Sequence, residues 1–429
     1  MASLQNIKGK LLVSLPFLLQ VTIKILALSL GIFTTRWVNI NFSISERANL
    51  ETVFSISALM LAVIGFGTPN IIYKLYLNKD KYVGSLASYW STINLFRVIC
   101  FIVSLPIIYL IGSMWGVSNW LFLYGVYTVQ FILELDLHFK SISDTNGRAV
   151  YYSISDFLSK AIIVILLYGG IYLLPRNVIE IYVFVYAIAN LGTVFLDMYF
   201  QRASVKWGVI KWGLLKNLRS ELSVMFLSNI VMAIYLRTLP LFLKGYSDNI
   251  IASYGNSQKV FDLWSVIPAI TVPVIVAKMV NQLKELENSN SESDTKNNQQ
   301  KRDQILKKNI LICLGFGVSL AVVSVITYPI ISVLVGLEKY TLTRNFYLIQ
   351  VFGLTIFPLL YFFGNYFLFL NKEKYQLVAA ISTAILTIGS ILILNHYLGY
   401  FGAIIGLTLG YIFEFLIKLI LFIRQEKSL

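Results

Sequence analysis

Three basic residues lie inside long apolar segments with no acidic residue within four positions on either side: Lys24, Arg97 and Arg237. An ionisable side chain in mid-bilayer costs roughly 2.5–3.5 kcal/mol on insertion scales, so it needs a reason to be there. One interpretation is that the three face a shared water-filled cavity and bind an anionic head group, which suits the planar fork of arginine. The alternatives are an interhelical bridge from Arg97 to Glu134 or Asp136, and snorkelling of Arg237 towards the interface.

Three further basic residues inside apolar segments have an acidic neighbour about one helical turn away. The pairs are Asp156 with Lys160, Lys259 with Asp262, and Glu414 with Lys418. Residues three or four apart share one helix face, so we expect these pairs to be local and structural.

No motif for enzymatic chemistry occurs in the sequence. The chain has 2 histidines, which excludes an HExxH zinc set, and it has no GxxxxGK[ST] loop for a nucleotide. We therefore expect no catalytic residue, no metal and no cofactor. His138 and His396 both fall near the ends of apolar segments, which predicts an interfacial position for each.

The composition is that of a membrane protein. Hydrophobic residues make up 57% of the chain and charged residues 13%, where a soluble domain has about a quarter charged. Apolar runs of about 20 residues recur along the chain, which predicts an all-α polytopic membrane protein. The net charge of +14 follows mostly from the positive-inside rule, so we expect no nucleic-acid partner.

Twelve spans are predicted, at 11–33, 51–70, 85–112, 117–137, 154–174, 179–200, 222–243, 255–277, 309–332, 345–370, 376–395 and 401–423. The connections on one side hold 23 lysines and arginines, and those on the other side hold 6. Because short basic loops stay in the cytoplasm, this split predicts that both termini are cytoplasmic.

Two of the predicted cytoplasmic connections stand out. The stretch 201–221 carries five basic residues and divides the chain into parts of similar length. The stretch 280–308 includes ENSNSESDTKNNQQKRD, which is too polar to bury a core, so we expect a solvated, mobile linker there.

Weak internal repeats support a division into halves. The segment Phe17–Val21 resembles Phe226–Ile230 at an offset of 209, and Ala48–Phe54 resembles Gly255–Phe261 at an offset of 207. A six-span unit inserts twice with the same orientation, so the halves are expected to be parallel and related by an axis along the membrane normal. The predicted parts are 1–200, the linker 201–221, and 222–429.

The chain resembles the multidrug/oligosaccharidyl-lipid/polysaccharide exporter superfamily, and within it the O-antigen and capsule repeat-unit flippases. The resemblance is carried by the twelve spans in two halves, the polar starts of spans 2 and 8, and Gly65-Phe66-Gly67-Thr68-Pro69-Asn70 closing span 2. The chain departs from the family where the usual Arg-x-Leu-Gly segment is Arg36-Trp37-Val38-Asn39.

The resemblance implies two helix bundles around a central cavity and alternating access in a bacterial cytoplasmic membrane, with a polyprenyl-diphosphate-linked oligosaccharide as cargo. It also implies contacts with membrane lipids and with polysaccharide assembly machinery. Lys24, Arg97 and Arg237 would then bind the diphosphate, while Gln20 and Asn229 would bind sugar hydroxyls or join helices.

Because the chain has no nucleotide motif, an H⁺ or Na⁺ gradient is expected to drive the cycle. The candidate coupling carboxylates are Asp262, Glu414 and Asp197, and nothing in the sequence selects among them. Pro268 and Pro273, five residues apart in span 8, mark a candidate bending gate or a static kink.

Two other functions compete with the flippase hypothesis. A multidrug exporter of the same superfamily would favour deep acidic residues for cationic drugs, whereas the unpaired deep charges here are basic. A membrane polymerase or ligase for polysaccharide is disfavoured, because such enzymes need a sizeable outward loop and the predicted outward loops are short.

Overall fold

The computed structural model describes residues 2–77, 84–146, 148–173, 178–288, 295–370 and 372–426. These residues form helices and connecting turns, with no strand among them. The elements are α1 (Ala2–Asn41), α2 (Ile44–Gly65), α3 (Thr68–Leu77), α4 (Leu86–Met114), α5 (Trp120–Thr145), α6 (Ala149–Leu173), α7 (Val178–Phe200), α8 (Gly213–Asn217), α9 (Arg219–Arg237), α10 (Leu239–Phe242), the 3-10 turn η2 (Leu243–Gly245), α11 (Asp248–Asn288), α12 (Thr295–Val335), α13 (Thr343–Phe369) and α14 (Glu373–Glu426).

The number of spans agrees with the sequence prediction. Ten of the described helices are long and apolar enough to cross a membrane, and α9 with α10–η2, bent by 42°, makes an eleventh when the pair is counted as one span. The segment Lys374–Glu426 in α14 has 53 residues, about 80 Å of helix, which is more than twice the thickness of a bilayer core. Counting α14 as two spans gives twelve in the described chain. The predicted all-α membrane fold is confirmed, and the central cavity stays a prediction.

Helix α14 folds back on itself at Gly399, where φ is +59°. Past this turn the glycines Gly402, Gly406 and Gly410 recur every four residues. A Cβ at any of them would meet the first half of the helix, at Leu394, Ile391 or Thr387. This spacing of small residues lets two membrane helices approach backbone to backbone, so α14 is a tight antiparallel hairpin.

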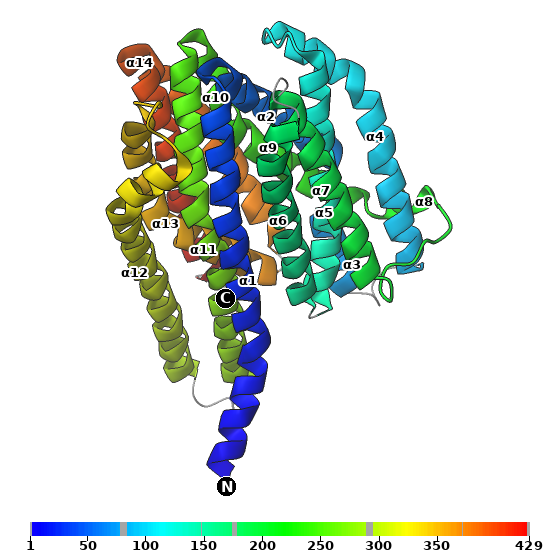
Figure 1. The fold of residues 1–429 in the computed structure, drawn as a ribbon. Coiled ribbons are helices and arrows are strands. Elements are labelled where there is room, and N and C mark those ends of the chain that lie inside the picture. Colours follow the sequence, from blue (N-terminus) through cyan, green and yellow to red (C-terminus); the bar gives the residue numbers. More distant parts are fainter. Residues whose placement is uncertain are drawn as a thin grey trace. The chain divides into compact units, whose positions relative to one another are not determined.

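The chain divides into two compact units, and unit 1 comprises Met1–Ala233 with Leu334–Gly336. In this unit α1 packs against α6, and α5 packs against α2, α3, α6 and α7 (Figure 1). A buried core that includes Ile72, Ile93 and Ile142 joins α3, α4 and α5. Helix α5 is therefore the central helix of unit 1.

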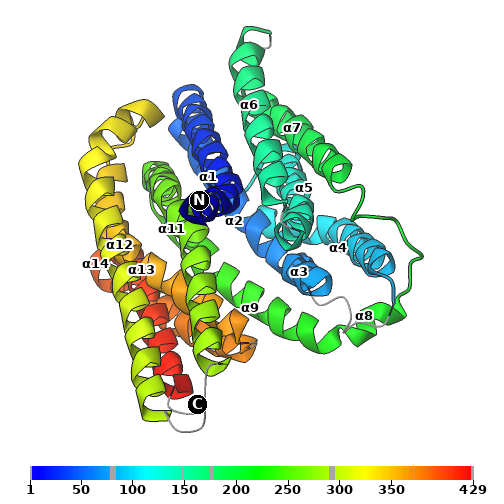
Figure 2. The same ribbon diagram turned by 90° about the horizontal axis from the view of Figure 1, so that it is seen from below.

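Unit 2 comprises Ile234–Val333 and Leu337–Leu429. Helix α13 packs against both α11 and α14, with α12 beside them (Figure 2). The core of this unit includes Val276, Cys313, Phe362 and Phe422, one from each of these four helices.

The boundary between the units falls inside α9, whereas the sequence predicted a linker at 201–221. The first part of α9 stays with unit 1 because Phe226 stacks on Phe66, with ring centroids 4.7 Å apart. The stretch 201–221 also belongs to unit 1, since the backbone N–H of Gly208 donates to Ser91 Oγ (2.9 Å) and that of Lys211 to Thr92 Oγ1 (3.0 Å). This basic segment is thus packed along α4.

The prediction of a structureless linker over 280–308 is wrong for most of its length. Helix α11 continues to Asn288 and α12 begins at Thr295, so only 289–294 lies outside the described residues. Lysine, glutamate and glutamine, which are frequent in this stretch, are good helix formers and favour a helix even where no apolar face is present. An ion pair also stabilises the start of α12, because Arg302 pairs with Glu426 of α14 at 3.0 Å.

Helix α2 ends at a sharp break that a glycine makes possible. Phe66 and Gly67 both have positive φ, at +50° and +65°, and α3 begins at Thr68. A Cβ at Gly67 would lie 2.7 Å from the Cβ of Met225, so the break needs glycine for both conformation and space. The predicted span 51–70 is therefore two helices, with the break in its last turn.

Candidate functional site

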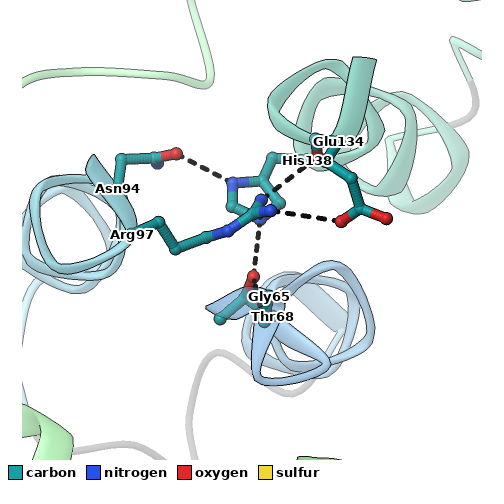
Figure 3. Close-up of polar contacts among 6 residues, drawn as sticks. All are labelled: Gly65, Thr68, Asn94, Arg97, Glu134 and His138. Carbon is teal, nitrogen blue, oxygen red and sulfur yellow. Dashed lines mark hydrogen bonds and ion pairs between the residues drawn. The ribbon is translucent and has the colours of Figure 1, made fainter. Parts of the chain in front are cut away.

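A buried network of polar side chains lies beside the break between α2 and α3. Arg97 of α4 has no exposed surface, and its Nη2 donates to Glu134 Oε2 of α5 at 3.1 Å. Its Nη1 donates to the backbone carbonyl of Glu134 at 3.2 Å (Figure 3). The guanidinium also lies over the ring of Phe131, 5.6 Å from its centroid. The arginine therefore contacts α5 through an ion pair, hydrogen bonds and a cation–π contact.

His138 is at the centre of the network, one turn after Glu134 on α5. Its Nε2 lies 3.0 Å from Arg97 Nη1, and its Nδ1 lies 2.8 Å from Asn94 Oδ1. Arginine only donates, so Nε2 accepts, and Nδ1 carries the proton given to Asn94. The hydrogen-bond pattern thus assigns the neutral Nδ1–H tautomer, because a proton on Nε2 would face the arginine donor.

The network reaches the helix break through Thr68. Its Oγ1 lies 2.9 Å from His138 Nε2 and 2.8 Å from the carbonyl oxygen of Gly65, the last residue of α2, and its one hydroxyl proton is donated to one of these two acceptors at a time. Phe66, within the break, packs on Phe96 of α4 with centroids 5.0 Å apart. The backbone break is therefore held by the same two helices, α4 and α5, that carry the ion pair (Figure 3).

Only the acidic end of the ion pair is accessible. The Glu134 side chain is 33% exposed while that of Arg97 is 0% exposed. Arg97 Nε is buried and has no hydrogen-bond partner among the described residues, so its remaining donor faces protein and not an opening. A solute that approaches this site meets a carboxylate first.

The structure therefore shows the interhelical bridge from Arg97 to Glu134, which the sequence had left as the alternative. A diphosphate would have to displace Glu134 before it could contact Arg97. Direct substrate binding by Arg97 stays a prediction that requires this rearrangement.

Lys24 lies elsewhere in unit 1. Its side chain is partly exposed on α1, and its charged neighbours are on α5 and α6: Lys140, Asp144, Asp156 and Lys160. It makes no ion pair within 4.0 Å with any described side chain, whereas Lys160 pairs with Asp156 at 2.9 Å as predicted. Arg97 is not among these neighbours, so the structure does not bring Lys24 and Arg97 into one site.

The other sequence-predicted binding residues are dispersed. Gln20 of α1 and Asn229 of α9 are half-buried in unit 1, and Arg237 is exposed in unit 2. Gln20 and Asn229 make no side-chain hydrogen bond in the part of the chain that the structure describes. Their proposed roles in binding sugar stay predictions.

A second buried acidic site lies in unit 1, where α5, α6 and α7 meet. The carboxyls of Asp136 and Asp197 are 5% and 0% exposed, and each is close enough to the other for their charges to interact. Ser155 Oγ donates to Asp197 Oδ1 at 2.7 Å, and Tyr152 is a neighbour of Asp136. Asp136 Oδ1 and Asp197 Oδ2 are buried and have no hydrogen-bond partner among the described residues.

The two candidate coupling residues of unit 2 have different surroundings. Glu414 accepts from Tyr235 OH at 2.9 Å and pairs with Lys418, as the sequence predicted. Asp262 Oδ1 accepts from the Gln258 amide at 2.8 Å. These contacts are with hydroxyl, lysine and amide groups, whereas Asp197 lies beside a second carboxyl.

The proposed gate is part of one long helix. Pro268 and Pro273 lie inside α11, which runs from Asp248 to Asn288 without a break. The described helix breaks occur instead at 66–67, at Thr238 and at Gly399. Bending at the two prolines stays a prediction.

Sequence reasoning missed three members of the network: Thr68, Asn94 and His138. The prediction that His138 is interfacial is wrong, because its side chain is fully buried. A signal was present, since Asn94 precedes Arg97 by three residues and Glu134 precedes His138 by four. Each pair shares one helix face.

No group of three or more His, Cys, Asp or Glu side chains suited to a metal ion occurs within the described ranges.

No protein-family model and no curated protein matches the chain. Solved structures with the same fold do exist. An inward-facing multidrug resistance MATE family transporter of the MOP superfamily has a TM-score of 0.72 and 15% identity, covering 96% of this chain and 98% of that one. An outward-facing structure of such a transporter has a TM-score of 0.68 and 16% identity, covering 97% and 94%.

A third similar structure is a MOP superfamily transporter from Pyrococcus furiosus, for which reverse polarity of the binding pocket suggests a different function. It has a TM-score of 0.65 and 16% identity, and covers 95% of this chain and 94% of that one. The chain thus has the fold of MATE transporters over nearly its whole length. The fold expected from the resemblance is confirmed.

Proposed function

We propose that the protein is a secondary transporter that exports amphipathic, positively charged organic compounds by alternating access. Transporters with this fold include inward-facing and outward-facing forms, which supports alternating access. The observation that carries the choice of substrate is the ion pair whose accessible end is Glu134. The multidrug exporter, second among the sequence hypotheses, is therefore our first candidate.

Among transporters with one fold, we expect the charge of the binding site to determine which class of substrate is carried. One structure of the same fold has a pocket of reverse polarity, for which a different function is suggested. In this chain Arg97 is buried and its charge is already paired with Glu134, so the charge is unavailable to a phosphate. Glu134 offers an exposed carboxylate that a cationic head group can contact without breaking a buried bond.

Flipping of a polyprenyl-diphosphate-linked oligosaccharide is the second candidate. It is favoured by Lys24, which is partly exposed and pairs with no described carboxylate within 4.0 Å. On this hypothesis Lys24 would bind the diphosphate and Arg97 would become available only after Glu134 is released. Contacts with polysaccharide assembly machinery belong to this candidate.

We assign ion coupling to the carboxyl pair of Asp136 and Asp197. Of the three candidate carboxylates, Glu414 has Lys418 as a counter-ion and Asp262 has an amide donor, whereas Asp197 faces a second carboxyl. Like charges in a shared buried site cannot both ionise, so such a pair binds and releases a proton. This favours H⁺ over Na⁺ as the coupling ion.

Cellular phenotypes separate the two candidates. The gene is deleted in its host, which we expect to be a bacterium with the protein in its cytoplasmic membrane and both termini inside. Loss of resistance to lipophilic cations with intact surface polysaccharide supports the exporter. Accumulation of a lipid-linked oligosaccharide with unchanged drug resistance refutes it and supports flipping.

A further inference from the structure

A groove with a volume of about 770 Å³ lies between α11 and α12, near the C-terminal end of α11 and the N-terminal end of α12. Three lysines, one glutamate, three side-chain amides and four aliphatic residues line it, all of them in unit 2. The three lysines, Lys278, Lys301 and Lys308, are exposed. This groove is separate from the networks at Arg97 and Asp197.

One end of the groove has an aliphatic residue on each helix. Ile275 and Ile312 are the lining residues furthest from the neighbouring helix ends, and Lys278 and Lys308 are the next charged lining residues towards those ends. At 1.5 Å per residue, Lys278 lies about 15 Å from the end of α11 and Lys308 about 20 Å from the start of α12. The two lysines therefore lie at similar depths on facing helices.

These two cations have no counter-ion in the described chain. Neither makes a hydrogen bond or an ion pair within 4.0 Å with any described side chain. Glu285, the one acidic lining residue, is seven residues from Lys278, or roughly 10 Å along α11, which is beyond pairing distance. The groove thus combines two uncompensated positive charges with an aliphatic wall.

The spans predicted from the sequence place these lysines at the membrane surface. The sequence places the end of span 8 at 277 and the start of span 9 at 309, next to Lys278 and Lys308. Lipid phosphates lie at this level, and the cytoplasmic leaflet is anionic. A free phosphate would gain nothing from Ile275 and Ile312, whereas a lipid chain would cover them.

We propose that this groove is a binding site for an anionic phospholipid of the cytoplasmic leaflet. Lys278 and Lys308 hold the phosphate from either side, and an acyl chain lies along Ile275 and Ile312. Two surface lysines in an anionic bilayer each contribute electrostatic attraction, so losing both reduces affinity by about tenfold or more.

Native mass spectrometry of the purified full-length protein tests this site, with phosphatidylglycerol and phosphatidylethanolamine as probes. The variant is Lys278→Gln/Lys308→Gln, and the matched control is Lys307→Gln/Lys374→Gln, which removes two exposed lysines outside the groove. We expect the preference for phosphatidylglycerol to fall about tenfold in the first variant and to stay within about twofold of wild type in the control.

Two results would overturn the proposal. An unchanged preference in the groove variant would mean that its lysines only extend into solvent. A stronger preference of the wild type for undecaprenyl phosphate than for phosphatidylglycerol would make the groove an entry site for a lipid-linked substrate. Thermal unfolding of both variants without lipid identifies any general loss of folding. The single variant Lys308→Arg keeps both positive charges of the groove, so we expect it to bind phosphatidylglycerol as the wild type does.

Discussion

Arg97 and Glu134 form an ion pair of 3.1 Å in which the arginine is fully buried and the glutamate is one-third exposed. This asymmetry means that the two residues are not equivalent. Without Glu134 the arginine is a buried charge with no carboxylate partner, whereas without Arg97 the glutamate can still be hydrated. The pair also joins α4 to α5 beside the break between α2 and α3.

We predict that Glu134→Gln destabilises the protein by roughly 3–5 kcal/mol, the usual cost of leaving one buried charge uncompensated. Arg97→Gln should cost clearly less, and the double variant should recover most of the stability lost in Glu134→Gln. Thermal unfolding in detergent and membrane abundance measure this order. Equal losses from both single variants would contradict the asymmetric burial.

The role of His138 as a hydrogen-bond acceptor for Arg97 can be tested by replacing the histidine. We expect His138→Gln to stay near wild-type stability, because the amide oxygen can accept from Arg97. His138→Leu removes the acceptor for Arg97 and the donor for Asn94, and should cost about 1–3 kcal/mol. Chemical unfolding of the three proteins provides the comparison, and a Leu variant as stable as the Gln variant would argue against the network.

The helix break gives a prediction for glycine substitution. Gly67→Ala should destabilise the protein, because φ is +65° and the new Cβ would meet Met225. Gly169→Ala is the matched control, since a Cβ there has no described atom within 4 Å and helical alanine is favoured over glycine by roughly 0.5–1 kcal/mol. A Gly67→Ala protein with the melting temperature of the control would mean that α2 and α3 can form one continuous helix.

For coupling, we predict that Asp136→Asn/Asp197→Asn abolishes accumulation of substrate driven by a proton gradient. Exchange of labelled for unlabelled substrate across the membrane should persist, because it needs no net proton movement. Glu414→Gln serves as the comparison, as that carboxylate has a lysine partner. If the double variant still accumulates substrate, the pair does not couple, and if both activities disappear at normal abundance, its role is structural.

The sequence was sufficient for the overall fold because bilayer thickness sets span length, so apolar runs and basic loops determine the number and order of the helices. It failed where polar helices leave the membrane: the residues around 280–308 are helical because helix propensity needs no apolar face. It also missed the break at Gly67 as a feature of span 2, since the space for a side chain there is limited by Met225, more than 150 residues away.

The candidate site was predictable only in part. Arg97 was identified as significant because a mid-span charge needs a reason, and Glu134 was named as one possible partner. Whether the charge faces a cavity or a neighbouring helix depends on the rotation of α4 against α5, which spacing along one helix does not determine. For the same reason His138 was assigned to the interface and Asp136 was named only as an alternative partner of Arg97, since the partners of both residues come from other helices.

The most direct test of the account is transport by the purified protein in liposomes, with a proton gradient and a matched pair of amphipathic dyes that are positively and negatively charged. We predict gradient-driven movement of the cationic dye only, and loss of that movement in Arg97→Gln/Glu134→Gln, which keeps the buried site uncharged. Glu134→Asp should retain part of the activity, because it keeps the carboxylate. Transport of the anionic dye, or of a polyprenyl-diphosphate-linked sugar, in preference to the cation and dependent on Arg97 would contradict the account.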